Sequence, residues 1–194
     1  MPIVKNDHGG GNQTNINGFA FEQATSLDDA FLTKGYFVKD YYVYDHPMCL
    51  EPLGMSVPKH FFYSHFLIPH GVQYEQINSK KWLPDEAFVN FRTKTVYIIE
   101  KKFQNGRGSV DEKLPNCHFK KIEYEKLCHP IGYTVKFIYL LSDWFLRPQY
   151  KDTLDYILYV ECEYYYNQLP FSSIGLKPLP FYYSQKQIEL PSVT

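Results

Sequence analysis

The feature that most constrains this chain is an apolar run that ends abruptly in charge. "TVYII", residues 95–99, is followed directly by Glu100, Lys101 and Lys102. A short run of β-branched and aromatic residues favours a buried strand. A charge at the end of such a strand is costly unless a partner compensates it. The sequence therefore predicts a strand whose last residues meet either an ion pair or a metal ion.

The preceding run, "PDEAFVNF", is also strand-like, and its second residue is Asp85. "FRTKT" between the two runs suits a hairpin turn, although it lacks the Asn-Gly signal. Because side chains alternate between the faces of a strand, Glu100, Lys102 and Gln104 are expected on one face. Lys101 is expected on the other face, where it would be little more than a surface charge. An antiparallel hairpin then places Asp85 alongside Glu100.

Two carboxylates and an ammonium group are thereby predicted to converge. Two close carboxylates repel each other unless a cation neutralises them, and Mg²⁺ needs few carboxylates beside its waters and a substrate phosphate. Asp85 and Glu100 are the expected metal ligands, and Lys102 is expected to orient or activate the attacking water. The predicted chemistry is phosphodiester hydrolysis. An ordinary ion pair across the hairpin is the alternative, since Pro-Asp is often only a turn opener.

The elements around this hairpin predict a mixed α/β sandwich, with one central sheet and helices on both faces. Residues 17–36 fit one helix that begins at an Asn17 N-cap and stops at Gly35. "YFVKDYYVYD" follows this helix and is rich in strand-forming residues, so it is expected to form a strand.

A second helix is expected after the hairpin. Ser109 and Glu112 fit a capping box, so this helix should begin at Val110. Pro115 should kink or restart the helix one turn in, because proline cannot donate the backbone hydrogen bond of a helix interior. The helix should then continue to about Cys128.

The remaining segments complete the expected domain. "YTVKFIYLL" suits a strand buried on both faces, and residues 150–169 suit a last amphipathic helix. Residues 46–83 suggest an irregular insertion with a short strand near "FFYSHFLI", and the tail from Pro170 is expected to wrap the surface. We therefore expect a flexible N-terminal arm over residues 1–15 and a single domain over residues 16–194 that carries the insertion.

Charge and cysteine usage narrow the class of protein. The net charge is −1, so no global basic field marks a nucleic-acid binder. Residues 101–136 nevertheless hold eight Lys or Arg against four acids, whereas residues 142–170 hold five acids against two basic residues. The four cysteines form no C-x-x-C pair, which favours reduced thiols over a zinc site. With no segment of membrane-spanning length, a cytoplasmic protein with no membrane partner is expected.

Pro84-Asp85, fourteen intervening residues and Glu100-x-Lys102 resemble the motif of the PD-(D/E)xK nuclease superfamily. The extension "EKKFQNGRGSVDEKL" is similar to type II restriction endonucleases and related phage and bacterial nucleases. The resemblance covers about residues 18–145. It implies a restriction-endonuclease-like αβββαβα sandwich, of the α/β (α+β) class, around a central mixed sheet.

The resemblance also implies roles for single residues. Lys102 would serve the nucleophilic water, and Gln104 would orient water or substrate. Glu22 in "GFAFE" matches a glutamate on the first helix, either a metal ligand or a residue that supports the ligands. Because helical spacing places Glu22 opposite the apolar stripe of its helix, a solvated glutamate is the alternative.

The activity implied by the resemblance is Mg²⁺-dependent, type II restriction-type cleavage of double-stranded DNA. The chain shows no helix-turn-helix, zinc finger or separate basic domain, so a larger sequence-reading subunit or a homodimer is the expected partner. A DNA repair or junction-resolving nuclease and a non-catalytic subunit of nuclease fold are the alternatives. The expected DNA contacts are basic residues that follow the hairpin: Arg107, Lys113, Lys120 and Lys121.

Overall fold

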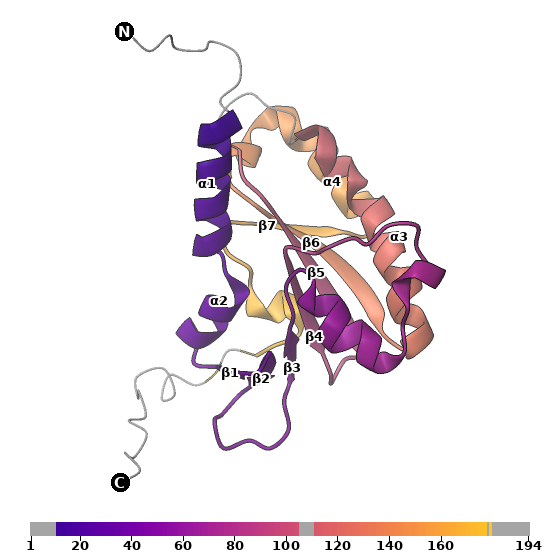
Figure 1. Ribbon diagram of the computed structural model, residues 1–194. Coiled ribbons are helices and arrows are strands. Elements are labelled where there is room, and N and C mark those ends of the chain that lie inside the picture. Colours follow the sequence, from indigo (N-terminus) through magenta and orange to yellow (C-terminus); the bar gives the residue numbers. More distant parts are fainter. Residues whose placement is uncertain (1–10, 105–110, 178, 180–194) are drawn as a thin grey trace, which may run out of the picture.

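A seven-stranded mixed sheet lies at the centre of the protein, whose computed structural model describes residues 11–104, 111–177 and 179. α1 (Gly11–Ala24) and α2 (Leu27–Thr33) lie on one face of this sheet (Figure 1). α3 (Cys117–Cys128) and α4 (Lys151–Tyr159) lie on the other face. One mixed sheet between helices confirms the predicted fold class.

The strands follow one another across the sheet in chain order. The first five pair antiparallel, whereas β5, β6 and β7 pair parallel. Parallel neighbours need crossover connections, and α3 and α4 provide them. The strand bounds are β1 Phe37–Lys39, β2 Tyr42–Tyr44, β3 Gly54–Ser56, β4 Glu86–Asn90, β5 Thr95–Lys102, β6 Thr134–Leu141 and β7 Glu163–Tyr166.

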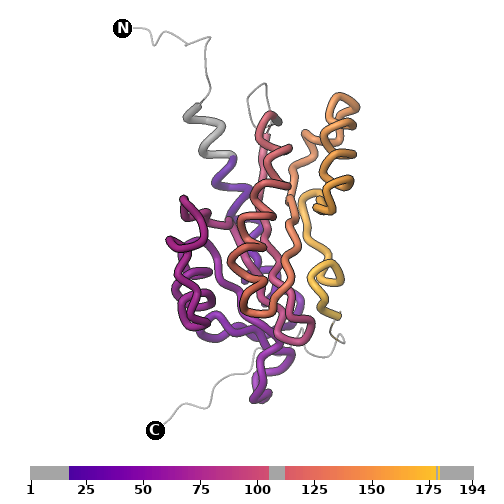
Figure 2. Tube along the Cα trace, turned by 90° about the vertical axis from the view of Figure 1, so that its right-hand side faces the viewer, coloured from indigo at the N-terminus to yellow at the C-terminus, as the bar shows by residue number. Residues whose placement is uncertain are grey.

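Alternate residues of β5 enter two separate hydrophobic cores. Ile98 packs with Phe66 and with residues of α3 and α4, on what we call the α3 face. Ile99 packs with Phe31 of α2, on the α2 face. Figure 2 shows η1 (Phe62–Leu67), α3 and α4 side by side over the α3 face. The "TVYII" run is therefore buried on both sides.

The first predicted helix is two helices in the structure. The break falls at Ser26, whose side chain accepts a hydrogen bond from the Asp29 backbone N–H (3.4 Å) and caps α2. Asn17 is not an N-cap, since it lies inside α1. Gly35 does follow the end of α2, with a φ of 85° that suits glycine.

The strand predicted over "YFVKDYYVYD" is instead the β1–β2 hairpin. Asp40 and Tyr41 join the two strands with φ angles of 49° and 70°. Two successive left-handed residues form the tight turn whose twist matches that of paired strands. The sequence does not predict this turn, because the segment is rich in strand-forming residues and neither turn residue is glycine or asparagine.

Residues 46–83 hold more regular structure than the sequence predicts. β3 lies within them, and "FFYSHFLI" forms the π-helix η1 rather than a strand. Phe62, Tyr63, Phe66 and Leu67 are all buried, and their spacing is helical. Two short 3-10 helices follow, η2 Ile68–His70 and η3 Tyr74–Gln76.

The helix predicted over residues 150–169 is too long. α4 ends at Tyr159, the chain reverses at Glu161 with a φ of 56°, and β7 follows. The tyrosines of β7 favour a strand. The 3-10 helices that follow α3 in the described ranges are η5 His129–Ile131, η6 Asp143–Leu146, η7 Pro148–Tyr150 and η8 Phe171–Ile174.

The helix predicted from Val110 begins differently. Ser109 and Val110 lie outside the described residues, and η4 (Asp111–Asn116), which contains Pro115, precedes α3. The predicted end at Cys128 is confirmed. Of the predicted N-terminal arm, residues 1–10 lie outside the described residues and residues 11–15 belong to α1. Among the helices that the structure describes, none has the length and apolarity to cross a membrane.

Candidate active site

The β4–β5 hairpin sets the positions of the candidate catalytic residues. Glu86 pairs with Ile99 across the two strands, so continuing the register by one residue places Asp85 opposite Glu100. Asp85 Oδ2 accepts a hydrogen bond from the Lys101 backbone N–H at 2.8 Å. The side chain of Asp85 is therefore tied to the end of β5, as the sequence predicts.

Glu100 lies at the centre of a compact charge cluster. The residue is only 3% exposed, and its Oε2 accepts hydrogen bonds from Lys102 Nζ (3.1 Å) and Lys120 Nζ (2.8 Å). Lys102 Nζ also lies 3.8 Å from Asp85 Oδ2. Asp85, Glu100 and Lys102 thus converge on the α3 face, and a second lysine joins them from α3.

The second carboxylate oxygen of Glu100 bears on metal binding. Glu100 Oε1 is buried and has no hydrogen-bond partner among the described residues. A buried, unpartnered carboxylate oxygen is unfavourable, and a cation is the partner that such an oxygen fits. The described residues contain no group of three or more His, Cys, Asp or Glu side chains that could hold a metal. Two carboxylates nevertheless suit Mg²⁺, which keeps several waters and takes substrate phosphate oxygens.

Lys101 is not the surface charge that the sequence suggests. Its Nζ lies 2.7 Å from Glu86 Oε1 and donates a hydrogen bond to the Glu22 backbone carbonyl at 2.9 Å. The Leu27 backbone N–H donates to the same Glu86 oxygen at 3.4 Å. Burial raises the pKa of Glu86, and Lys101 opposes that rise. Lys101 is therefore a buried ion-pair partner on the α2 face, where it joins β5 to β4 and to the α1–α2 junction.

Glu22 and Gln104 are held differently from the central cluster. The Glu22 side chain lies 3.9 Å from Lys59 Nζ, and its helix, α1, covers the α2 face. Among the described residues, the ion-pair partner of the Glu22 side chain is therefore Lys59 and not the lysines of the Asp85–Glu100 cluster. Gln104 is buried, and its backbone N–H donates to Ser142 Oγ at 3.2 Å. Its side chain lines a cavity of about 460 Å³ beyond the ends of β5 and β6.

The four predicted DNA contacts fall into different settings. Arg107 lies outside the described residues, and Lys113 is exposed. Lys121 Nζ lies 3.5 Å from Glu161 Oε2 and 4.0 Å from Glu125 Oε1. Lys120 alone among the described three reaches the candidate active site.

Two features of the site escape the sequence reasoning. The first is the direct contact of Lys120 with Glu100. The second is Tyr124, four residues later, whose hydroxyl is buried without a hydrogen-bond partner among the described residues. Burial raises the pKa of Tyr124 well above its usual value, and the charge of Glu100 adds to the rise. The i, i+4 spacing of Lys120 from the large aromatic Tyr124 is the signal that could have placed both on the inner side of α3.

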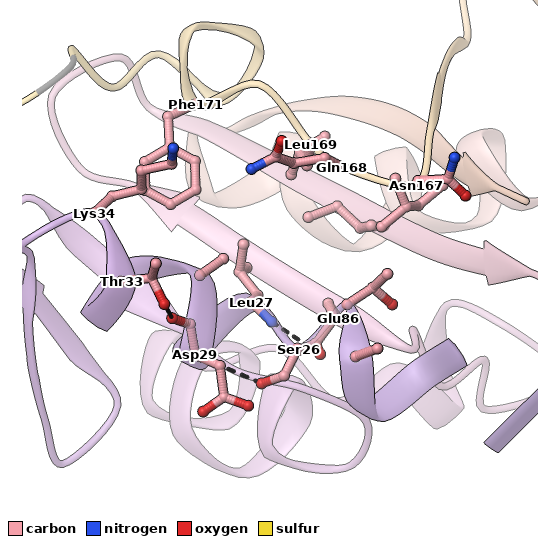
Figure 3. Close-up of a pocket in the computed structure, with 15 residues that line it drawn as sticks. Ser26, Leu27, Asp29, Thr33, Lys34, Glu86, Asn167, Gln168, Leu169 and Phe171 are labelled. Atoms are coloured by element: carbon pink, nitrogen blue, oxygen red, sulfur yellow. Dashed lines mark hydrogen bonds between the residues drawn. The ribbon is translucent and has the colours of Figure 1, made fainter. Parts of the chain in front are cut away.

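A separate cavity of about 220 Å³ lies on the α2 face (Figure 3). α2 and the segment after β7 line it, with Glu86 at its wall, and the hydrogen bonds from Leu27 to Glu86 and from Asp29 to Ser26 are drawn there. Because Glu86 and Glu100 point to opposite faces, this cavity is separated from the Asp85–Glu100 cluster by the sheet.

A mixed sheet between helices, with this hairpin among its central strands, is the architecture of a nuclease-type α/β domain. A family model described as the PD-(D/E)XK nuclease superfamily domain matches residues 13–128, more than half of the chain. The protein belongs to this superfamily. It is therefore a nuclease, with DNA as the implied substrate and a divalent metal, commonly Mg²⁺, as the cofactor that such nucleases generally use. Neither the curated proteins nor the solved structures include a significant match.

Proposed function

We propose that Asp85, Glu100 and Lys102 form the catalytic centre of a Mg²⁺-dependent, type II restriction-type endonuclease that cuts double-stranded DNA. The observation that carries this proposal is the buried Glu100 carboxylate. One of its oxygens holds two ammonium groups and the other has no described hydrogen-bond partner, opposite Asp85. Asp85 and Glu100 would hold the ion, which supplies positive charge beside the scissile phosphate.

The two lysines have distinct positions for the chemistry. Lys102 Nζ lies between the two carboxylates, where it can hold the attacking water and stabilise charge on the phosphate. Lys120 belongs to the first turn of α3, and a helix N-terminus favours anions. A cation on Glu100 would replace the lysines as its counter-charge. Metal binding would therefore free both ammonium groups for the phosphate.

Supporting roles follow for Glu22 and Gln104. Glu22 suits a supporting role better than a metal ligand, because its helix turn contacts the buried Lys101. Gln104 would orient water or substrate from the cavity beyond β5.

Residues 16–194 would act as one nuclease domain, and a larger subunit or a second copy would supply base readout. A non-catalytic role fits less well, because the site keeps both carboxylates and the lysine. A repair or junction-resolving nuclease remains the second candidate within the same chemistry.

The test uses isosteric and charge-removing variants. Asp85→Asn, Glu100→Gln and Lys102→Met should each lower plasmid cleavage in Mg²⁺ by about 10²-fold or more, the loss typical of one electrostatic group. Mg²⁺ should also raise the melting temperature of the wild type but not of Asp85→Asn, a readout independent of cleavage. The control is Asp155→Asn, an exposed carboxylate on α4 paired with Lys151. Wild-type cleavage by Asp85→Asn would refute the assignment.

Lys120 and Lys121 make a matched pair of neighbours. Lys120→Met should lower cleavage by about 10- to 100-fold, as expected when a charge-assisted hydrogen bond worth about 1.5–3 kcal/mol is lost. Lys121→Met should leave cleavage nearly unchanged, because Lys121 pairs with Glu125 and Glu161. Initial rates on one plasmid compare the two, and equal losses would mean that Lys120 has no special role.

A further inference from the structure

Two aromatic rings lie at the rim of the candidate active site. Trp82 lies three residues before Asp85, and its ring meets Phe119 of α3 edge-on, with the ring centroids 5.7 Å apart and 80° between the planes. Phe119 is 52% exposed. Lys120 Nζ, which binds Glu100 Oε2 at 2.8 Å, lies 5.8 Å from the Trp82 ring centroid. Phe119 is therefore open to solvent beside the buried carboxylate, whereas Trp82 is partly buried against the hydrophobic core.

The ring pair is fixed in place by contacts of its own segment. Asn78 Nδ2 donates a hydrogen bond to the Glu123 carbonyl of α3 at 2.9 Å. The Trp82 carbonyl accepts a hydrogen bond from Tyr63 Oη at 2.6 Å. These bonds tie the backbone of residues 78–82 to η1 and α3, and the Trp82 side chain packs against the hydrophobic core.

Exposed lysines lie beside Trp82 and beside Tyr63, which holds the Trp82 carbonyl. Lys80 Nζ lies 4.4 Å from the Trp82 ring centroid, and Lys81 Nζ lies 4.6 Å from the ring of Tyr63. Both lysine residues are exposed. Aromatic rings with an accessible face beside cations are the kind of surface that binds unpaired nucleic-acid strands, because every base offers a flat π-face and every nucleotide a phosphate. A Phe119 ring that only covered the core would be buried, as Phe62 and Phe66 are.

We infer that Trp82 and Phe119 form a stacking platform for one unpaired nucleobase of the cleaved DNA strand. The inference rests on the proposed function, since that function places the scissile phosphate at Lys102 and Lys120. In paired DNA the base faces are covered by their neighbours, and exposing one costs unstacking energy. The preferred substrate therefore presents an unpaired or extruded nucleotide next to the scissile bond.

The test is a fluorescence titration without catalysis. Trp144→Phe leaves Trp82 as the single tryptophan of the chain, and Asp85→Asn prevents turnover. Three duplexes of one sequence are compared: fully paired, with one unpaired nucleotide, and with that unpaired nucleotide lacking its base. Only the duplex with the unpaired base should quench Trp82. It should also bind about 5- to 150-fold more tightly than the other two, as expected for one base stacked on an aromatic side chain.

Substitutions at the exposed ring sharpen the test. Phe119→Ala should reduce the preference for the unpaired base by at least about five-fold, whereas Phe119→Tyr should keep it. Tyr42→Ala is the matched control, because Tyr42 is an exposed aromatic residue of β2, three strands away from β5 in the sheet. The strand register carries Tyr42 through Met55 and Val89 to Val96, four residues before Glu100. The control should therefore bind all three duplexes as the parent does.

The outcomes separate the platform from the hydrolysis. Equal affinity for the three duplexes without quenching, or no effect of Phe119→Ala, would overturn the platform. In that case cleavage by the chain that keeps Asp85 would leave the proposed hydrolysis standing. Selective quenching with no cleavage in Mg²⁺ would instead keep the platform as a binding site and refute the proposed hydrolysis.

Discussion

Two adjacent lysines illustrate how one strand separates stability from chemistry. Lys102 points to the α3 face and meets Asp85 and Glu100, whereas Lys101 points to the α2 face and meets Glu86. Lys101 and Glu86 are both buried. Losing either residue would therefore destabilise the protein, because the other would be left as an uncompensated buried charge.

Lys101→Met should therefore destabilise the protein by about 3–5 kcal/mol, whereas Lys102→Met should change stability little and abolish most of the activity. Urea unfolding measures the first effect and initial cleavage rates measure the second. Lys101→Met combined with Glu86→Gln should recover much of the lost stability, since the uncompensated charge is gone. If Lys101→Met unfolded at the wild-type urea concentration, the buried pair would have no stabilising role.

The same variant should respond to pH. Burial raises the folded-state pKa of Glu86, and losing Lys101 raises it further. An acid with a raised folded-state pKa favours folding below its unfolded-state pKa, and this contribution is lost as the pH rises through the folded-state value. The stability deficit of Lys101→Met should thus be small near pH 4.5, the usual carboxyl value, and large at pH 7.5. Urea unfolding at both pH values compares the variant with the wild type, and a deficit independent of pH would contradict this assignment.

At the scale of elements, the close packing of β3 against β4 leaves no room for a side chain at one glycine. A Cβ atom at Gly54 of β3 would lie 2.1 Å from the Val89 carbonyl oxygen of β4. Gly54→Ala should therefore force β3 away from β4 and cost about 2 kcal/mol or more. Gly18→Ala is the control, because a Cβ there meets nothing within 4 Å and alanine favours a helix by about 1 kcal/mol. Thermal unfolding should move in opposite directions for the two variants.

The elements also show what the sequence could predict. The hairpin was predictable because "TVYII" and "PDEAFVNF" fix which faces Glu100, Lys102 and Asp85 occupy. The β1–β2 turn was not predictable, because Asp40 and Tyr41 adopt left-handed backbone angles that these residue types rarely adopt. The role of Lys101 also escaped prediction, since its partner Glu86 is identified only by the pairing of two strands. The contact of Lys120 with Glu100 could not be predicted either. It depends on how α3 packs against β6, which the helical period of the sequence does not specify.

At the scale of the whole molecule, the charge distribution bears on DNA binding. Net charge is near zero, so basic residues around the site, rather than a global field, must hold the phosphates. Such contacts position DNA without reading its sequence.

The chain alone should therefore bind duplex DNA weakly, with little sequence preference, and the affinity should fall steeply with added salt through counterion release. Titrations at several salt concentrations measure this, and cleavage of defined duplexes over a wide protein range reports the partner. Second-order dependence on protein would indicate a homodimer, and rescue by a larger subunit would indicate a heterodimer. Sequence-specific cutting by a monomer would exclude both.

The short turn between β4 and β5 has a consequence for how this gene can change in length. Residues 91–94 lie outside the paired register, so an extra codon there lengthens a loop and leaves the pairing from Asn90–Thr95 onward intact. An extra codon a few positions later, inside β5, would exchange the two faces of everything beyond it. The lysine that pairs with Glu86 would then face the substrate, and the catalytic lysine would enter the core. An insertion inside β5 would therefore remove activity and stability together. An insertion within residues 91–94 would change both very little.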